Sequence, residues 1–352
     1  MIAAFEAVSW PGRVIFGVGT LDRAASEVRR LEARRVLVVH GASGLDAAQR
    51  VTEALGESAV GTFEDVRQHV PEDVAVAAVA RARERDVDGV VTIGGGSATG
   101  LGKAIALDTG VPILAIPTTY AGSEVTPIYG ITGEHKRTGR DPVVLPRTVI
   151  YDPELTLELT VASSATSGMN AMAQAVEACW SAPEDPVTTL LAQEAIQILA
   201  DALPRVVEAP HDLDARSDAL YGAFLAGTCL ARVTTGLHHK LCHAVGGTYG
   251  LPHAATHAVL LPHVASFNAS AAPETARLIA RALDAEDPGR ALHDLNRRIG
   301  NPTDLHDLGL PPGAVDRIAR MVAPDTEALR PRPATEEELR TLLTAASAGH
   351  AA

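Results

Sequence analysis

One stretch of the sequence, residues 89–107, decides the fold: GVVTIGGGSATGLGKAIAL. Its first five residues have the composition of a buried strand, and helical spacing runs from Ser97 to about Asp108. Glycines let a ligand approach the backbone closely, and a helix N-terminus presents free N–H groups and a positive dipole end. The turn Gly94–Ser97 therefore suits a pyrophosphate. It matches neither GxGxxG nor GxxxxGK[ST], so it does not identify the nucleotide, and a tight turn without a ligand is the alternative.

The stretches around this segment repeat the alternation of strand and helix. Helical patterns are expected from about Asp46 to Gly56 and from Pro71 to about Arg85. Short β-rich runs stand at residues 13–19, 36–40, 60–63, 111–117 and 147–152. Strands that alternate with helices through short loops form parallel sheets with crossover helices. The first part of the chain is therefore predicted to be an α/β domain with a parallel sheet.

The composition changes after about Pro153, where β-rich runs nearly vanish. Ala- and Leu-rich stretches with helical spacing follow at residues 161–180, 187–208, 212–231, 273–284, 312–322 and 335–346. We therefore predict two domains. Residues 1–155 form a nucleotide-binding α/β domain, and residues 156–352 form an all-helical substrate and catalytic domain.

Composition and charge narrow the class of protein. The 352 residues are 46% hydrophobic and only 3% aromatic, so Ala, Val and Leu must fill the core. The net charge of −13 argues against nucleic acid as a partner, because phosphate binding needs clustered Lys and Arg. No segment offers about 18 uninterrupted apolar residues, so no membrane span is expected. Three cysteines without a CxxC pair, and no apparent signal peptide in residues 1–13, predict a cytoplasmic protein.

A second glycine-containing loop, Pro117–Glu124, leaves the strand at 111–117 at its carboxyl end. Ligands of open parallel sheets bind at that edge. The hydroxyls and backbone N–H groups of this loop could hold a phosphate or a ribose. A turn that satisfies its own backbone groups is the alternative.

Histidines gather at residues 237–243, LHHKLCH, and LPH follows at 251–253. His239 and His243 are four residues apart and share a helix face. A loop through the glycines at 246, 247 and 250 is expected to bring His253 back to them. His257 and His263 are interpreted as surface or packing residues.

Asn170 and Gln174 are also four residues apart on a helical pattern. Polar side chains at this spacing in an Ala- and Leu-rich background need a reason, because burying them costs energy unless they are paired. Together with the histidines they have the frame of a four-ligand metal site. However, amides are poor ligands for transition metals, which favour imidazole and carboxylate.

Several segments together resemble the motifs of maleylacetate reductases, a branch of the iron-containing alcohol dehydrogenase superfamily. They are GGGSATGLGKAIAL (94–107), PTTYAGSEVTPIYG (117–130), KRTGRDPVVLPRTVIYDPELTLEL (136–159), SGMNAMAQAVEACW (167–180), HHKLCHAVGG (238–247) and LPHAATHAVLLPH (251–263). The resemblance covers roughly residues 10–265. It implies the dehydroquinate synthase-like fold of iron alcohol dehydrogenases, with an α/β domain, an all-α domain and a site in the cleft between them.

The resemblance also assigns roles to single residues. The cofactor, NADH or NADPH, would be held at Gly41, Gly95, Gly96, Ser97, Thr118, Thr119 and Tyr120. The four places where metal-dependent relatives carry Asp, His, His and His are Asn170, Gln174, His239 and His253. His243 would lie near the nicotinamide. Since the maleylacetate reductase branch carries Asn at the first of these places and is regarded as metal-independent, no metal is expected.

Three positions depart from the family pattern. Gln174 replaces a His that both branches usually keep. Residues 324–333 differ from the NP-containing segment that closes the family's site. The β-rich run at 36–40 ends at His40 and is followed by Gly41, where many relatives end the corresponding strand with Asp. Neither negative charge nor bulk at this position therefore opposes the 2′-phosphate of NADPH.

The expected function is reduction of a small dicarboxylate with a carbonyl or conjugated enone, as in the conversion of maleylacetate to 3-oxoadipate, by a homodimer. Without a metal, His243 and His253 are expected to stabilise charge on oxygen, and one of them to supply the proton. Lys240 is the candidate for binding a substrate carboxylate, with Arg137 and Arg140 as weaker alternatives.

Three other functions fit parts of the sequence. A metal-dependent alcohol dehydrogenase is opposed by Asn170 and Gln174. A redirected homologue could catalyse a non-redox biosynthetic step in the same site, which Gln174 and the altered segment 324–333 favour. A catalytically silent nucleotide-binding protein is opposed by the intact glycine turn and the retained histidines.

Overall fold

The computed structural model describes residues 12–133, 136–181 and 185–350. The prediction that the chain has no signal peptide concerns residues 1–13, and of these the described residues include only Gly12 and Arg13. The described residues up to Leu159 form one compact unit, and those from Thr160 onward form a second. A parallel sheet with helices builds the first unit and helices build the second, so the predicted fold class is confirmed.

A six-stranded sheet in the order β1-β8-β5-β4-β2-β3 forms the centre of the α/β unit. Every pairing in this sheet is parallel. Its strands are β1 (Val14–Phe16), β2 (Val36–His40), β3 (Ala59–Phe63), β4 (Gly89–Gly94), β5 (Ile113–Pro117) and β8 (Thr148–Tyr151). All six runs predicted as strands therefore lie in this sheet.

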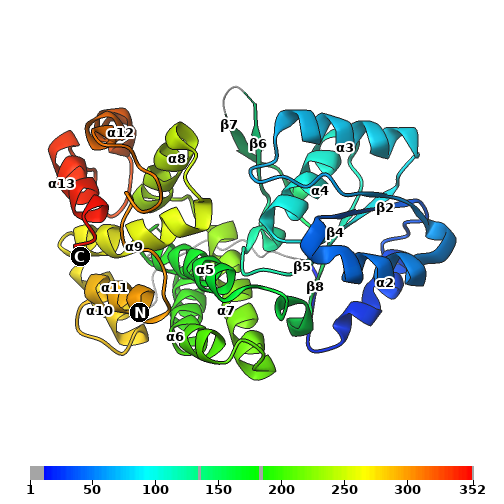
Figure 1. Cartoon of the computed structure of the whole chain (residues 1–352), viewed down its shortest axis with the longest axis horizontal. Helices are drawn as coiled ribbons and strands as arrows, with labels where there is room; N and C mark the ends of the chain where they lie inside the picture. The colour runs from blue at the N-terminus through cyan, green and yellow to red at the C-terminus, as the bar shows by residue number, and fades with distance from the viewer. Residues whose placement is uncertain (1–11, 134–135, 182–184, 351–352) are drawn as a thin grey trace. The chain divides into compact units, whose positions relative to one another are not determined.

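Helices cover both faces of the sheet, as a parallel sheet requires (Figure 1). Two of them, α1 (Ala24–Arg30) and α2 (Leu45–Leu55), pack on one face. Two others, α3 (Glu72–Glu84) and α4 (Gly96–Thr109), pack on the opposite face.

Strand β2 shows why both faces are apolar. Successive side chains of a strand point to opposite faces. Val36 and Val38 pack with α1 and α2, whereas Leu37 and Val39 pack with α3 and α4. All five residues of β2 are buried. Such an uninterrupted run is therefore typical of a central strand that has helices on both faces of its sheet.

The direction of winding reverses between β2 and β4. From β2 the chain moves outward to β3 at the edge, and from β4 it moves the other way to β5. Ligands of doubly wound sheets bind at the carboxyl ends of the strands at such a reversal. Gly41 follows β2, and Gly95 and Gly96 follow β4, so all three predicted cofactor-binding glycines lie at this edge.

An antiparallel hairpin of β6 (Ile128–Thr132) and β7 (Lys136–Arg140) was not predicted from the sequence. Lys, Arg and Gly dominate β7, and Lys and Gly are depleted in strands. The pairing places Tyr129 opposite Gly139, where an added Cβ would lie 2.5 Å from the Tyr129 hydroxyl oxygen. Tertiary packing, not local propensity, therefore builds this hairpin.

Nine α-helices make up the described part of the helical unit (Figure 1). They are α5 (Val161–Ser181), α6 (Pro186–Glu208), α7 (Leu213–Arg232), α8 (Leu237–Tyr249), α9 (His253–Ala269), α10 (Pro273–Ala282), α11 (Pro288–Arg298), α12 (Ala314–Val322) and α13 (Glu336–Ser347). Helices α9 and α11 fall in stretches without a predicted helix.

Helix α8 also runs on through Gly246 and Gly247, where a loop is expected from the sequence. Its buried Leu237, Leu241 and Val245 follow one another at four-residue spacing and pack into one apolar core with α9, α12 and α13. Tertiary packing of an apolar face stabilises a helix more than local propensity does. The expected loop is therefore reduced to Gly250–Pro252.

Helix α5 lies at the centre of the helical unit. Of its 21 residues 15 are buried, and it packs against α6, α7 and α9. Most of the buried residues are small or apolar. Asn170, Gln174 and Glu177 are exceptions, so α5 carries polar groups into the interior.

The α/β unit extends to Leu159, past the boundary expected between residues 155 and 156. Asp152 anchors this connection, because its carboxylate accepts hydrogen bonds from the backbone N–H groups of Gly19 at 3.2 Å and Leu21 at 2.9 Å. It also caps the short 3-10 helix Pro153–Thr156. The chain therefore leaves the α/β unit only after this helix.

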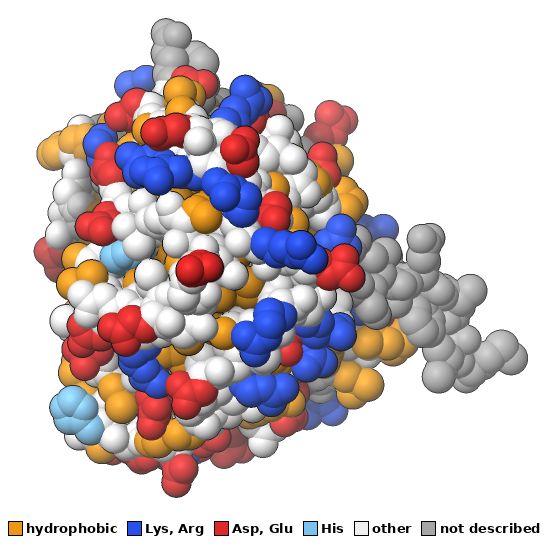
Figure 2. Space-filling view, turned by 90° about the vertical axis from the view of Figure 1, so that its right-hand side faces the viewer, with side chains coloured by type: hydrophobic (Ala, Val, Ile, Leu, Met, Phe, Trp, Pro, Cys, Tyr) orange, Lys and Arg blue, Asp and Glu red, His pale blue; other side chains and the backbone are white. Residues whose placement is uncertain are grey.

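The surface of the α/β unit carries mixed charge. Figure 2 shows a face on which Lys and Arg side chains are interspersed with Asp and Glu. Arg67 pairs with Asp65 at 2.6 Å, and Arg83 pairs with Asp108 at 2.7 Å.

In the described parts of the chain, no helix combines the length and the hydrophobicity that a membrane span needs.

A buried lysine fastens the loop after β5 to helix α4. The Lys103 side chain is fully buried. Its ammonium group donates hydrogen bonds of 2.6–2.8 Å to the backbone carbonyls of Ser123, Thr126 and Ile128. Three donors thus meet three acceptors, which offsets the cost of burying the charge. Lys103 therefore holds the segment that directly follows Thr118–Tyr120.

Replacing Lys103 by Met is expected to destabilise the protein, because three buried carbonyls lose their donor and the buried Glu124 loses a neighbouring cation. Breaking a buried charged network costs about 3–5 kcal/mol, which lowers the melting temperature by roughly 10 °C. Differential scanning calorimetry measures this. Arg83→Met, which removes an exposed ion pair, is the control and should cost about 1 kcal/mol or less. Equal melting temperatures for the two variants would contradict the prediction.

Candidate functional site

The turn after β4 requires glycine at two positions. Gly94 has a φ of +144°, which residues with a Cβ rarely adopt. At Gly95 an added Cβ would lie 2.9 Å from Cγ2 of Thr119. Helix α4 begins at Gly96 without a side-chain cap, so its first N–H groups can bind an anion. The segment Gly95–Ser97 therefore fits the pyrophosphate for which the sequence predicts it.

Thr118 and Thr119 lie beside this turn, at the carboxyl end of β5. The Thr118 backbone N–H donates to the Gly94 carbonyl at 3.1 Å, which joins the two loops. Both threonine hydroxyl oxygens are buried, and neither has a hydrogen-bond partner among the residues that the structure describes. Buried polar atoms without a partner are rare in native proteins. A ligand with polar groups, such as a nucleotide, therefore fits here, with the buried Tyr120 beside it in the chain.

In the helical unit, three polar side chains share one buried face of α5. Asn170, Gln174 and Glu177 are only 8%, 3% and 4% exposed, and they stand at i, i+4 and i+7. The sequence interpretation names the two amides but misses Glu177. Its spacing from Asn170 was the signal that could have identified it.

Glu177 is hydrogen-bonded to His239 of α8. Its carboxylate accepts one bond from Nδ1–H of the His239 ring and another, at 3.2 Å, from the His239 backbone N–H. Burial raises the pKa of Glu177, but the attraction of His239 and these hydrogen bonds outweigh burial and hold this pKa at about 2. Because Nδ1 is engaged, Nε2 is the ring nitrogen of His239 that can meet a ligand.

Five imidazole rings from α8 and α9 form a cluster, which we call the histidine cluster. Its members are His238, His239, His243, His253 and His257. The His257 ring lies 4.8 Å from those of His238 and His239 and 4.3 Å from that of His253, centroid to centroid. His243 and His253 are stacked at 6.2 Å with 21° between their planes. The structure therefore brings together the three histidines that the sequence predicts for the site.

His257 belongs to the cluster and is not a surface residue, which corrects one of the two interpretations of it from the sequence. Its side chain is fully buried, and neither ring nitrogen has a hydrogen-bond partner in the described parts of the chain. Burial, and after it the neighbouring histidines, hold the pKa of His257 well below its usual range. Burial likewise lowers the pKa of His238 to about 4. The i,i+4 spacing from His253 was the available signal.

The three candidate cations for a substrate carboxylate have different surroundings. The Lys240 ammonium lies 3.7 Å from the carboxylate of Asp325, and both side chains are partly exposed. Asp325 belongs to segment 324–333, so this altered segment lies beside α8. Arg137 and Arg140 lie on β7 of the α/β unit.

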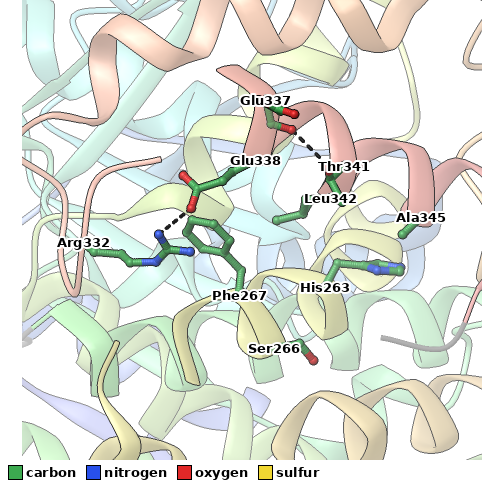
Figure 3. Close-up of a pocket in the computed structure, with 9 residues that line it drawn as sticks. All are labelled: His263, Ser266, Phe267, Arg332, Glu337, Glu338, Thr341, Leu342 and Ala345. Atoms are coloured by element: carbon green, nitrogen blue, oxygen red, sulfur yellow. Dashed lines mark hydrogen bonds and ion pairs between the residues drawn. The ribbon is translucent and has the colours of Figure 1, made fainter. Parts of the chain in front are cut away.

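A separate cavity of about 490 Å³ lies in the helical unit between α9 and α13. Figure 3 shows Arg332 at its side, over the ring of Phe267 at 3.8 Å and paired with Glu338 at 2.7 Å. None of the site residues predicted from the sequence lines this cavity. The candidate cofactor-binding residues therefore lie at the glycine turn of the α/β unit, and the candidate catalytic residues lie in the histidine cluster of the helical unit.

The two halves of the chain match two parts of one enzyme family. Residues 11–153 match the iron-containing alcohol dehydrogenases, and residues 164–347 match the C-terminal part of the Fe-containing alcohol dehydrogenase family. The chain belongs to the iron-containing alcohol dehydrogenase family. Members of this family are oxidoreductases, so the chain is an enzyme, as the sequence predicts.

Within this family the chain is similar to maleylacetate reductases. It is 48% identical to maleylacetate reductase 2 of Cupriavidus pinatubonensis over 98% of this chain and 97% of the relative. The crystal structure of maleylacetate reductase from Agrobacterium tumefaciens superposes with a TM-score of 0.95 at 43% identity and covers 100% of both chains. The resemblance stated from the sequence is confirmed.

A more distant neighbour carries a nucleotide. Sulfoacetaldehyde reductase from Bifidobacterium kashiwanohense, solved in complex with NAD+, has a TM-score of 0.89 and 26% identity over 97% of this chain and 98% of that chain.

The family's name implies iron, but the donors at the four expected positions do not fit it. Asn170 and Gln174 offer neutral amide oxygens, and His239 and His253 offer neutral imidazoles. Iron sites of this kind favour imidazole with carboxylate. The buried carboxylate of Glu177 is already bonded to His239. These four positions therefore hold no anionic ligand to offset the charge of an iron ion.

Glu177→Gln is expected to weaken the acid sensitivity of folding. Because the folded pKa of Glu177 is about 2 and its ordinary value is 4.5, the carboxylate stabilises the fold above about pH 5. This contribution, about 3 kcal/mol, is lost as the pH falls through 4.5 toward 2. The wild type should therefore be more stable than the variant at pH 7 and lose more of its melting temperature between pH 5.5 and 3.

The matched control for this pH series is Glu286→Gln, which removes an exposed carboxylate from the same unit. Its melting temperature should follow that of the wild type. If Glu177→Gln also follows the wild type across this pH range, the carboxylate does not stabilise the histidine cluster as described.

Proposed function

We propose that this enzyme reduces maleylacetate to 3-oxoadipate with NADH or NADPH and without a metal at the family's four ligand positions. One observation carries the proposal. The chain is similar to maleylacetate reductases over nearly its whole length, and this resemblance puts the amides of Asn170 and Gln174 at two of the four ligand positions, which leaves those positions without an anionic ligand. A pocket of N–H donors is the chemistry that remains when the anionic ligand is missing.

The α/β unit supplies the residues that would hold the cofactor. The N-terminus of α4 at Gly95–Ser97 suits the pyrophosphate, and the buried hydroxyls of Thr118 and Thr119 suit polar groups of the nucleotide. A reduced nicotinamide, when bound, supplies a hydride to the enone carbon of the substrate. The NAD+ complex of sulfoacetaldehyde reductase supports a nicotinamide cofactor for this fold.

The helical unit supplies the residues that would handle charge and protons. Addition of hydride to an enone moves an electron pair onto the ketone oxygen, and a proton must then reach the adjacent carbon. Imidazole N–H groups in a desolvated site stabilise such an oxyanion without reorganising. We assign this role to His243 and His253, one of which also delivers the proton. His239, held by Glu177, presents its Nε2 as a further contact.

Asn170, Gln174 and Lys240 would orient the dicarboxylate. The two amides can both donate and accept hydrogen bonds, so they can contact imidazoles or substrate oxygens from α5. The Lys240 ammonium can exchange its partly exposed bond to Asp325 for a substrate carboxylate. A dianionic substrate has two carboxylates for such contacts.

The protein should oxidise NADH when maleylacetate is added, and prior treatment with EDTA should leave this rate unchanged. The loss of NADH absorbance measures the reaction. His253→Gln should lower kcat by about 10²–10⁴-fold, because general acids contribute that much. His263→Gln, a buried histidine of the same helix outside the cluster, is the matched control and should retain turnover.

Two results would change this assignment. Activity that EDTA removes and added metal restores would return the chain to the metal-dependent alcohol dehydrogenases. Binding of NADH without any maleylacetate-dependent oxidation would favour the redirected or the silent homologue.

NADPH should be used within about tenfold of NADH in kcat/KM, a gap of about 1.4 kcal/mol or less. An acidic side chain at the carboxyl end of β2 or β3 would repel the 2′-phosphate of NADPH. Here β2 ends at His40, Glu64 lies 3.9 Å from His40, and Asp65 pairs with Arg67 at 2.6 Å. Parallel assays with both cofactors test this. A thousandfold preference for NADH would contradict it, and Glu64→Gln would then show whether Glu64 excludes the phosphate.

A further inference from the structure

The deepest part of the histidine cluster gathers ring nitrogens from three residues. His238, His239 and His257 are 2%, 7% and 0% exposed. One ring nitrogen of each lies within 4.8 Å of those of the other two. Only His239 is among the four positions where the family places its metal ligands.

Hydrogen bonds determine which nitrogen carries the proton in two of these rings. His238 Nε2 lies 3.1 Å from the backbone carbonyl oxygen of His257, and a carbonyl only accepts, so Nε2 carries the hydrogen. In His239 the Nδ1–H group is donated to Glu177. In the neutral rings, Nδ1 of His238 and Nε2 of His239 therefore carry lone pairs.

The third ring adds another lone pair in either tautomer. Neither nitrogen of His257 has a hydrogen-bond partner among the described residues, and the same holds for Nδ1 of His238. A buried acceptor without a donor is destabilising. Three imidazole lone pairs therefore lie in this part of the cluster. Among the described residues, no hydrogen-bond donor meets the lone pair of His238 or that of His257. A cation that binds the lone pairs removes that cost.

We propose that His238, His239 and His257 form a binding site for one divalent transition ion of the zinc class. Neutral imidazoles suit zinc, cobalt, nickel and copper rather than magnesium or calcium. Histidines that bind such ions usually donate their other ring N–H to a carboxylate or a backbone carbonyl. His239 does so to Glu177, and His238 does so to the carbonyl of His257.

The chemistry and the dimensions of the site also suit such an ion. Three neutral imidazoles are a known ligand set for zinc. The buried carboxylate of Glu177 lies directly behind His239 and holds its Nδ1–H, which leaves Nε2 as the ligand atom. With metal–nitrogen bonds of about 2.0–2.1 Å, tetrahedral ligands stand about 3.4 Å apart. One ring nitrogen of each residue lies within 4.8 Å of those of the other two, so ring rotations would have to bring the ligand nitrogens closer by up to about 1.4 Å. The sequence predicts no metal at a different set of donors, namely Asn170, Gln174, His239 and His253. Only His239 belongs to both that set and the site proposed here.

Titration with Co²⁺ tests the site directly. The full-length protein, treated with EDTA and dialysed, should take up one equivalent and develop the visible absorption of four-coordinate cobalt. His238→Gln and His257→Gln should each weaken binding at least tenfold. In the first of these variants the new side-chain amide can still donate to the backbone carbonyl of His257, so the ring nitrogen is removed with little loss of packing. His263→Gln should bind as the wild type does.

The outcomes separate the possible sites. If the wild type takes up no Co²⁺, the proposal is overturned. If binding survives both His238→Gln and His257→Gln but is lost in His253→Gln, the ion lies at the family's positions and the proposal is again overturned. Circular dichroism checks that each variant is folded, and if His257→Gln is not, His238→Gln alone decides.

A bound ion would occupy Nε2 of His239, so stoichiometric Zn²⁺ should inhibit turnover of the EDTA-treated enzyme. The turnover that His238→Gln keeps, whatever its rate, should not be inhibited by Zn²⁺, while His263→Gln should be inhibited like the wild type. The inhibition rests on the proposed reduction of maleylacetate, whereas the Co²⁺ titration contains no substrate. Failure of the proposed function therefore leaves the test of the metal site intact.

Discussion

The helical unit is organised around one buried carboxylate. Glu177 stands on a central, alanine-rich helix, and a charge in such an interior is unfavourable unless it is paired and hydrogen-bonded. His239 meets this requirement with both its ring and its backbone N–H. The start of α8 must therefore lie beside α5. Gly236, just before α8, reflects the same closeness, because an added Cβ would lie 3.3 Å from a Glu177 oxygen. The rest of the histidine cluster follows from this placement.

The α/β unit offers a different kind of group to a negatively charged ligand. The buried ammonium group of Lys103 is directed at backbone carbonyls of the protein itself. Helix N–H groups remain to contact a ligand, as do the hydroxyls of Thr118 and Thr119, which have no partner among the described residues. A cofactor phosphate would thus be bound by oriented dipoles, which cost little to bury when they are already part of helix and loop. Lys103 acts by fixing the loop that carries these groups.

The two amides on α5 change the chemistry of the family's site more than its geometry. The helices still bring His239, His243 and His253 together, as a metal site would require, yet no anionic ligand stands at the four family positions. Under the proposed function, His243 and His253 would then act as hydrogen-bond donors toward substrate oxygen. His257, in ring contact with His238, His239 and His253, shows that the cluster also contains acceptors that this donor role does not use.

The sequence by itself determined the six parallel strands, the division into an α/β and a helical part, and the glycine turn, because these depend on short-range periodicity and backbone conformation. The i,i+4 spacings likewise placed Asn170 with Gln174 and His239 with His243. It did not reveal the β6–β7 hairpin, whose second strand has weak propensity and forms through pairing with the first. Nor did it reveal the bond between Glu177 and His239, which stand 62 residues apart, or the burial of His257. Those were decided when α5, α8 and α9 packed together, since which partner neutralises a buried charge depends on tertiary distance rather than on spacing along the chain.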